Sequence, residues 1–225
     1  MIVSRGRGYV FVHVPKTGGT AMALALEAHA LPDDLLIGDT PRARARRHQL
    51  RGLAPAGRLW KHSTLADIEG VVAREEFSRL LVVTLTRNPW DRLVSYWTWL
   101  RAQGFGHPAV ALAKSTTFSG FLNAPATQAS LLANPLSRYL TDGSGTERPA
   151  LVLRLERLDE DMVPLARHLG FHPEVERVNA SDRPRDWRRF YSEADAALVG
   201  RLCAPDVARS GYRFDDYAAL AAPRP

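Results

Sequence analysis

The clearest indication of the fold class is the segment Tyr9-Val-Phe-Val-His-Val-Pro-Lys-Thr-Gly-Gly-Thr20. Its first six residues form a near-continuous apolar, β-branched and aromatic run, which is typical of a strand buried on both faces in a parallel sheet. Pro15 ends the run, two glycines follow, and strong helix formers occupy residues 21–28. A strand, a glycine-containing loop and a helix in this order are typical of a nucleotide-binding βα unit.

The loop after this first strand has the composition of an anion-binding site. Gly18 and Gly19 allow a tight turn in which successive backbone N–H groups point at one anion. The following helix adds its own unpaired N–H groups and a positive dipole end. Thr17 and Thr20 offer hydroxyl donors, and Lys16 offers a cation. The loop is not a Walker A motif, because the lysine precedes the glycines. An ordinary Gly-Gly turn is the structural alternative.

Strands and helices alternate along the rest of the chain. Residues 80–86 and 150–155 are further buried strands, and residues 59–61 predict a short one. Helices are expected at residues 21–28, about 63–72, 89–101, 118–122, 158–169 and 192–203, with irregular chain and short helix elsewhere in 32–58, 104–114 and 122–145. This alternation predicts an α/β fold, a single P-loop-like domain over residues 1–225 with a central parallel sheet flanked by helices.

A second segment with chemical character, residues 86–97, follows the strand at 80–86. Arg87 lies where strands of an open sheet present ligand contacts, and it offers a bidentate fork to a phosphate. Asn88 is expected to cap the next helix, and Asp91 to close a capping box. Ser95 lies further along that helix with one hydroxyl. In the alternative interpretation, Arg87 pairs with a carboxylate and Ser95 is a small packing residue.

Composition and charge exclude several protein classes. The net charge is +6, and residues 40–66 alone carry seven basic residues and no acidic one. This local excess indicates a basic flank beside an anion site or a solvated loop, and it gives weak support to nucleic-acid binding. The one cysteine, Cys203, excludes an internal disulfide and fits a reducing compartment. No apolar run is long enough to span a membrane. These features predict a cytoplasmic protein with no nucleic-acid or membrane partner.

The loop at 15–20 and the segment at 87–95 together resemble the sulfotransferases that use 3′-phosphoadenosine 5′-phosphosulfate (PAPS). The resemblance is greatest to the branch containing carbohydrate O-sulfotransferases and their bacterial relatives. Pro-Lys-Thr-Gly-Gly-Thr is similar to that family's 5′-phosphosulfate loop, and Arg-Asn-Pro-Trp-Asp-Arg-Leu-Val-Ser to its 3′-phosphate motif. Order, spacing and placement match over residues 9–100. Weaker similarities follow at residues 153–158, 178–181 and 211–214.

The resemblance implies a role for each motif residue. The residues that would hold the 5′-phosphosulfate are Lys16, Thr17, Gly18, Gly19 and Thr20, and those for the 3′-phosphate are Arg87 and Ser95. A later basic loop would close over the nucleotide through Arg183 or Arg185. The implied activity is transfer of the sulfuryl group to a hydroxyl of a small-molecule or carbohydrate acceptor by in-line displacement. Adenosine 3′,5′-bisphosphate is the product, and Lys16 would stabilise the charge growing on this leaving group.

Related sulfotransferases often place a catalytic histidine between the two motifs, and His62 is the candidate for that base here. An imidazole accepts a hydroxyl proton near neutral pH without extreme tuning. Other members use a glutamate, and Glu27 on the first helix is the alternative. His13 is expected to be satisfied in the core. His168 and His172 straddle the helix-ending Gly170, so no metal site is assigned.

Two other functions stay open. A P-loop-like ATP-dependent kinase of a small metabolite would lack both the Walker lysine and a convincing magnesium-binding aspartate after a strand. A nucleotide-binding or nucleic-acid-binding module without enzymatic activity has only the basic segment at 40–66 in its favour. The acceptor is expected to contact the irregular segments at about 32–58 and 104–148.

Overall fold

The computed structural model describes residues 1–176, 183, 184 and 186–216 of the chain. The chain divides into two compact units. The first consists of Met1–Thr86 with Leu136–Val178, and the second of Arg87–Pro135 with Asn179–Pro225. The first unit contains the sheet and the glycine loop, and the second is helical. That residues 1–225 act as one domain stays a prediction.

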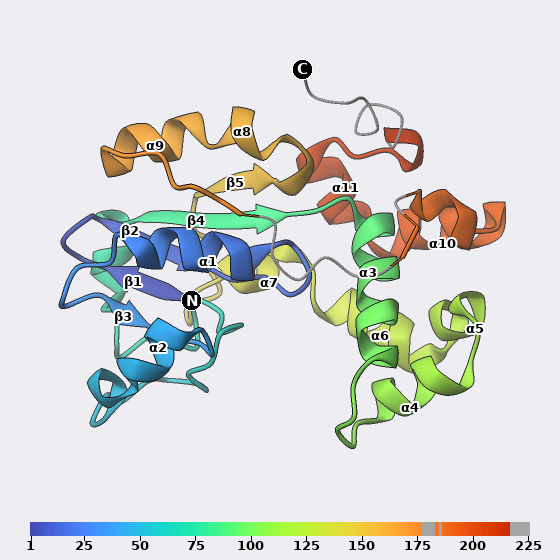
Figure 1. The fold of residues 1–225 in the computed structure, drawn as a ribbon, viewed down its shortest axis with the longest axis horizontal. Helices are drawn as coiled ribbons and strands as arrows, with labels where there is room; N and C mark the ends of the chain where they lie inside the picture. The colour runs from blue at the N-terminus through green and yellow to red at the C-terminus, as the bar shows by residue number, and fades with distance from the viewer. Residues whose placement is uncertain (177–182, 185, 217–225) are drawn as a thin grey trace. The chain divides into compact units, whose positions relative to one another are not determined.

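The centre of the first unit is a five-stranded sheet in the order β3-β1-β2-β4-β5 (Figure 1). Its strands are β1 (Ile2–Ser4), β2 (Tyr9–Val12), β3 (Leu35–Leu36), β4 (Leu81–Thr86) and β5 (Ala150–Arg154). Strands β2, β4 and β5 are parallel, with Val12 opposite Thr84. The carboxyl ends of β2 and β4 therefore lie at one edge, which is the edge where open α/β sheets bind ligands.

The sheet is mixed, so the prediction of an α/β fold is confirmed, and that of a parallel sheet holds for β2, β4 and β5 but not for β1 and β3. Strand β1 runs antiparallel to both β2 and β3. A turn at residues 5–8 joins β1 to β2, and in it the Gly8 N–H donates to the Arg5 carbonyl at 3.2 Å. Such a short connection joins only antiparallel strands. Strands β1 and β3 have three and two residues, too few for a strand pattern to stand out in the sequence.

Both faces of the sheet are buried, which explains the unbroken apolar run of β2. The helices of this unit are α1 (Gly19–Ala28), α2 (Pro41–Ala45), α7 (Leu136–Leu140), α8 (Leu158–Asp161) and α9 (Val163–Leu169). Tyr9 and Phe11 pack on one face with α1, α8 and α9. Val10 and Val12 pack on the other face with α7. Alternate residues of the strand thus enter two separate hydrophobic clusters.

The helix predicted over residues 158–169 is interrupted, because Pro164 in the first turn of α9 cannot donate a helical hydrogen bond to the preceding turn. Gly170 closes α9 with a left-handed φ of 77°, as predicted. Short 3-10 turns complete the unit at η1 (Arg47–Leu50), η2 (Arg74–Ser78) and η3 (Leu155–Arg157).

Residues 59–72 form neither the short strand nor the helix that the sequence predicted. The buried Ser63 hydroxyl accepts the Trp60 N–H at 2.9 Å. The Asp67 carboxylate accepts from the Thr64 N–H at 2.7 Å. Gly70 follows with a left-handed φ of 86°. Side chains that bond the backbone locally compete with regular structure, and here they produce a series of turns.

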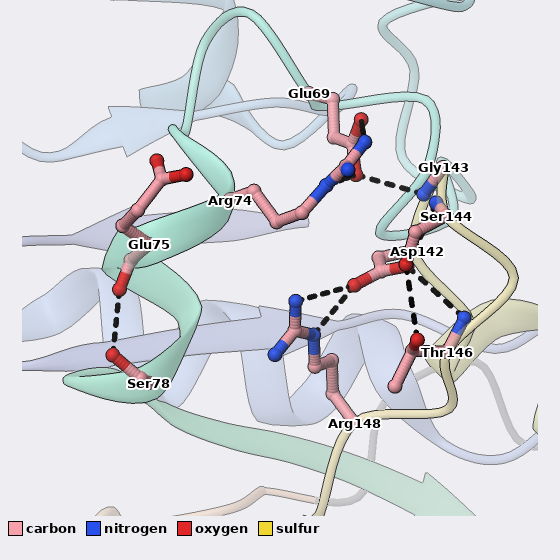
Figure 2. A network of polar contacts seen from close by, with 9 residues as sticks. All are labelled: Glu69, Arg74, Glu75, Ser78, Asp142, Gly143, Ser144, Thr146 and Arg148. Atoms are coloured by element: carbon pink, nitrogen blue, oxygen red, sulfur yellow. Dashed lines mark hydrogen bonds and ion pairs between the residues drawn. The ribbon is translucent and has the colours of Figure 1, made fainter.

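A polar network fixes the turn after α7 (Figure 2). The Asp142 carboxylate accepts from the Ser144 hydroxyl at 2.6 Å and from Arg148 Nε at 2.6 Å. These donors lower the pKa of Asp142 to about 2, with the Ser144 hydrogen bond as the largest cause. Glu69 accepts from the Gly143 N–H at 2.8 Å. The network therefore holds an ionised carboxylate at the entry to β5.

The second unit is built from helices around one hydrophobic cluster. They are α3 (Pro89–Arg101), α4 (Pro108–Ser115), α5 (Phe118–Asn123), α6 (Pro125–Ala133), α10 (Glu193–Leu202) and α11 (Ala204–Ser210), with 3-10 turns η4 (Trp187–Phe190) and η5 (Phe214–Asp216). The predicted helices at 89–101, 118–122 and 192–203 are confirmed. Residues expected to be irregular around them form α4 and α6, because Pro108 and Pro125 occupy first-turn positions instead of breaking helices. No helix in the described part of the chain is long and apolar enough to cross a lipid bilayer.

Candidate active site

The glycine loop between β2 and α1 has an unusual backbone conformation. Lys16 adopts a left-handed φ of 66°, the only non-glycine residue of the described chain to have a positive φ. Gly18 has φ 89° and ψ 5° and is the N-cap of α1 without a side-chain cap. The loop therefore turns twice through left-handed geometry before the helix begins. The Ala21 N–H donates to the Gly18 carbonyl at 3.1 Å, so the N–H groups of Gly19 and Thr20, at the positive end of the helix dipole, are those that a ligand would meet.

Close contacts require a glycine at both positions, and the left-handed φ of Gly18 requires one there as well. A Cβ at Gly19 would lie 2.1 Å from His13 Cδ2 and 2.5 Å from His13 Nε2. A Cβ at Gly18 would lie 2.7 Å from the Leu155 side chain. Real Cβ atoms do not approach other atoms this closely. The loop is thus packed directly against the His13 ring.

The two threonines of the loop have different surroundings. The Thr17 side chain is buried, and its hydroxyl donates to the Val14 carbonyl at 2.9 Å, which fixes the loop to the end of the strand. That contact uses the only hydroxyl proton of Thr17, so a ligand would meet its backbone N–H or the hydroxyl lone pairs. Thr20 is half-buried and lines a small cavity together with His13, Glu27 and Lys61.

His62 is held beside this loop by its contact with His13. Its Nδ1 lies 2.8 Å from the His13 carbonyl oxygen, and a carbonyl only accepts, so Nδ1 carries the proton. In the neutral ring Nε2 is therefore the atom with the free lone pair. The ring also packs against the His13 ring (4.6 Å between centroids) and edge-on against Trp60 (4.9 Å, 87°).

Burial keeps both imidazoles neutral. The pKa of His62 is lowered to about 4, chiefly by desolvation; the hydrogen bond to the His13 carbonyl raises it in part, and the charge of Lys61 contributes to the lowering. Burial also holds the pKa of His13 well below its usual range. Both rings are therefore uncharged at neutral pH. His62 is in the form that can accept a proton, although its lowered pKa makes it a weaker base than an imidazole in water. His13 follows β2, packs against the loop and orients His62. The sequence analysis assigned His13 to the core alone and so missed this role.

Glu27, the alternative base, is buried in the wall of the same small cavity. The Thr40 hydroxyl lies 2.7 Å and 2.9 Å from its two carboxylate oxygens. Burial raises the pKa of Glu27, although the Thr40 hydrogen bond lowers it in part. A raised pKa would make the carboxylate a stronger proton acceptor. The structure brings both candidate bases close to the glycine loop.

Part of the basic segment at 40–66 has a structural use. The guanidinium of Arg42 donates to the Glu27 carbonyl, and that of Arg46 donates to the Leu31 carbonyl at 2.5 Å. These carbonyls lie at and just beyond the end of α1, where helix acceptors lack intrahelical partners. Lys61 Nζ donates to Asp39 at 2.7 Å. The positive charge of the segment is therefore not all directed at a ligand.

The second unit contains the predicted 3′-phosphate residues. Asn88 caps α3 by accepting the Trp90 N–H at 3.1 Å, as predicted. Asp91 binds two arginines instead of the predicted capping-box partner. It accepts from Arg87 Nη2 at 2.6 Å and from Arg183 Nη2 in a short contact. A carboxylate binds a charged guanidinium more strongly than a neutral backbone N–H, which explains why Asp91 pairs with the arginines instead of closing the capping box.

The cluster of Arg87, Asp91 and Arg183 is largely buried, with side-chain exposures of 16%, 12% and 9%. Its net charge is +1, and two guanidinium forks converge on one carboxylate. The structure therefore shows the pairing of Arg87 with a carboxylate that the alternative interpretation predicted. A second arginine, Arg183, binds the same carboxylate. Ser95 is buried on α3. Arg185 and the similarity at 178–181 lie outside the described residues.

No protein-family model matches the chain, and no curated protein matches it.

Proposed function

We propose that the chain is a sulfotransferase that uses PAPS and moves its sulfuryl group to a hydroxyl of a small-molecule or carbohydrate acceptor. The proposal rests on one observation above the others. A neutral histidine, His62, is fixed through Nδ1 to the residue that leads into a phosphate-type loop, and its Nε2 lone pair is available. A fixed base beside an anion-binding loop suits the transfer of an anionic group to a hydroxyl.

The reaction is an in-line displacement at sulfur. The acceptor oxygen forms a bond to sulfur while the bond from sulfur to the 5′-phosphate oxygen breaks, and the acceptor proton passes to His62 Nε2. Negative charge grows on the departing adenosine 3′,5′-bisphosphate, where Lys16 and the loop N–H groups would stabilise it. Positioning and electrostatics would supply most of the acceleration, as in phosphoryl transfer. No metal has a part in this scheme.

The 3′-phosphate would be held by Arg87, by Ser95 and by Arg183. The supporting observation is that Arg87 and Arg183 converge on Asp91 and leave a net positive cluster. A carboxylate that holds two guanidinium groups in place reduces the side-chain entropy lost when a phosphate binds. Asp91 would therefore be a positioning residue for both arginines.

Sulfuryl transfer from labelled PAPS to a panel of hydroxylated acceptors, without magnesium, tests the proposal. Lys16→Ala should reduce turnover by roughly 100-fold or more, the scale of losing a preorganised charge stabiliser. His62→Ala should abolish transfer and leave binding of adenosine 3′,5′-bisphosphate nearly intact. His172→Gln, a change at an exposed histidine, is the control and should leave transfer unchanged. Full activity of Lys16→Ala would contradict the role of the loop, and magnesium-dependent ATP turnover would favour a kinase.

A further inference from the structure

Trp60 is an exposed aromatic side chain directly beside the proposed base. Forty per cent of its surface is exposed, yet its ring meets His62 edge-on at 4.9 Å between centroids. Tryptophans are usually well buried, because their large apolar surface gains most from leaving water. An exposed tryptophan in contact with a candidate catalytic residue is therefore a candidate ligand surface.

The backbone around this tryptophan is clamped. The Ser63 side chain is fully buried, and its hydroxyl accepts the Trp60 N–H at 2.9 Å. The same hydroxyl lies 2.8 Å from the Arg58 carbonyl and 2.9 Å from the Trp60 carbonyl, one of which receives its proton. One buried hydroxyl thus holds the backbone that carries Arg58, Trp60 and His62, so these side chains are presented by an ordered turn.

Arg58 supplies a cation at this surface. Its Cζ lies 5.0 Å from the centre of the Trp60 ring, within the range of a cation–π contact. Such a contact restrains the guanidinium beside the ring, and the group has N–H donors that a ligand could accept from. In the described part of the chain no ion pair joins Arg58 to a carboxylate. Among the basic residues around it, Lys61 pairs with Asp39, and Arg42 and Arg46 donate to backbone carbonyls.

We infer that Arg58 and Trp60 form the acceptor subsite for a small hydroxylated carboxylic acid. The ring of the acceptor packs against the exposed part of Trp60 that Arg58 and His62 leave uncovered, its carboxylate accepts hydrogen bonds from Arg58, and its hydroxyl faces His62 Nε2. The acceptor is therefore a ring that carries both a hydroxyl and a carboxylate. Aromatic hydroxy acids and sugar acids both have this chemistry. The assignment rests on the proposed function, because His62 is the base of that reaction.

Paired probes that differ only in charge test this inference by calorimetric titration of the full chain, with and without adenosine 3′,5′-bisphosphate. The aromatic pair is 4-hydroxyphenylacetate and 4-hydroxyphenylacetamide, and the sugar pair is glucuronate and glucuronamide. For one of the pairs the acid should bind about tenfold more tightly than its amide. Arg58→Gln should remove this preference, and added salt should weaken it. Trp60→Ala should weaken the binding of acid and amide alike.

The matched control is Arg101→Gln, because Arg101 forms the same kind of contact with Trp97, at 4.6 Å, in the other unit. It should keep the preference for the acid. Equal binding of acid and amide in both pairs, no binding of any probe, or equal effects of Arg58→Gln and Arg101→Gln would overturn the subsite. Sulfuryl transfer without a preference for acids would support the proposed function and overturn the assignment of Arg58 and Trp60 as the acceptor subsite. If the protein does not bind the bisphosphate but prefers acids in a way that depends on Arg58, the acid-binding subsite stands and the proposed function is contradicted.

Discussion

Replacing His62 by glutamine tests the buried neutral histidine without any assumption about the reaction. Glutamine has a polar N–H that can still donate to the His13 carbonyl, but it does not titrate. The pKa of His62 is lowered from 6.5 to about 4 in the folded chain. The unfolded chain therefore binds a proton at this position at a higher pH than the folded chain does.

The sign and size of the effect follow from this difference. A lowered folded-state pKa contributes stability that is complete above the unfolded pKa of 6.5 and is lost as the pH falls toward 4. The slope is at most about 1.4 kcal/mol per pH unit for one proton. Between pH 7 and pH 5 the free energy of unfolding should fall by about 2 kcal/mol through His62. His13 acts in the same direction and Glu27 in the opposite one, so the wild-type chain alone does not isolate this contribution.

The assay is urea unfolding followed by tryptophan fluorescence at pH 7, 6 and 5. The fall in stability from pH 7 to pH 5 should be smaller by about 2 kcal/mol in His62→Gln than in the wild-type chain. His172→Gln, at an exposed position, should follow the wild-type chain at each pH. If His62→Gln loses as much stability as the wild-type chain between these values, His62 is not buried and neutral as the account requires.

Three further substitutions, with Gly104→Ala as a control, test the loop and the arginine cluster. Gly19→Ala should destabilise the chain by about 1–3 kcal/mol, because its Cβ would collide with His13, whereas Gly104→Ala, with no atom within 4 Å of the new Cβ, should not. His13→Ala should relieve most of the Gly19→Ala penalty in a double-mutant cycle by urea unfolding, and additive effects would refute the contact. Asp91→Asn removes the charge that orders Arg87, so it should weaken binding of adenosine 3′,5′-bisphosphate by about tenfold in a calorimetric titration; unchanged affinity would show that Asp91 does not position the arginine.

The sequence predicted the elements whose patterns are strong and local. Strand β2, the glycine loop and helix α3 with its Asn88 cap lie where the apolar run, the glycines and the Asn-Pro pair indicated. Strands β1 and β3 were not predicted, because three or two residues are too few to show the alternating pattern of a strand. They form by pairing with other strands of the sheet. Helices α4 and α6 lie in segments that were expected to be irregular, and Pro108 and Pro125 occupy their first turns.

The candidate site was predictable to the extent that motifs define it. The loop residues could be chosen from the motif, and His62 from the resemblance to sulfotransferases. The partnership of His62 with His13 could not be predicted, because it joins residues 49 positions apart through a backbone carbonyl. A histidine just before a glycine loop was a signal that could have been used. The pairing of Asp91 with Arg183 also depends on tertiary structure, since 92 positions separate the two residues. Local patterns do not determine such contacts, which form only when the chain has folded.

The most direct test of the account is calorimetric titration with adenosine 3′,5′-bisphosphate, beside ATP and 5′-AMP, without magnesium. The account predicts micromolar binding of the bisphosphate, much weaker binding of 5′-AMP, and loss of the difference in Arg87→Ala but not in the Arg101→Gln control. That result would establish a site for the 3′-phosphate. Equal binding of the bisphosphate, ATP and 5′-AMP, unaffected by Arg87→Ala, would contradict the sulfotransferase proposal.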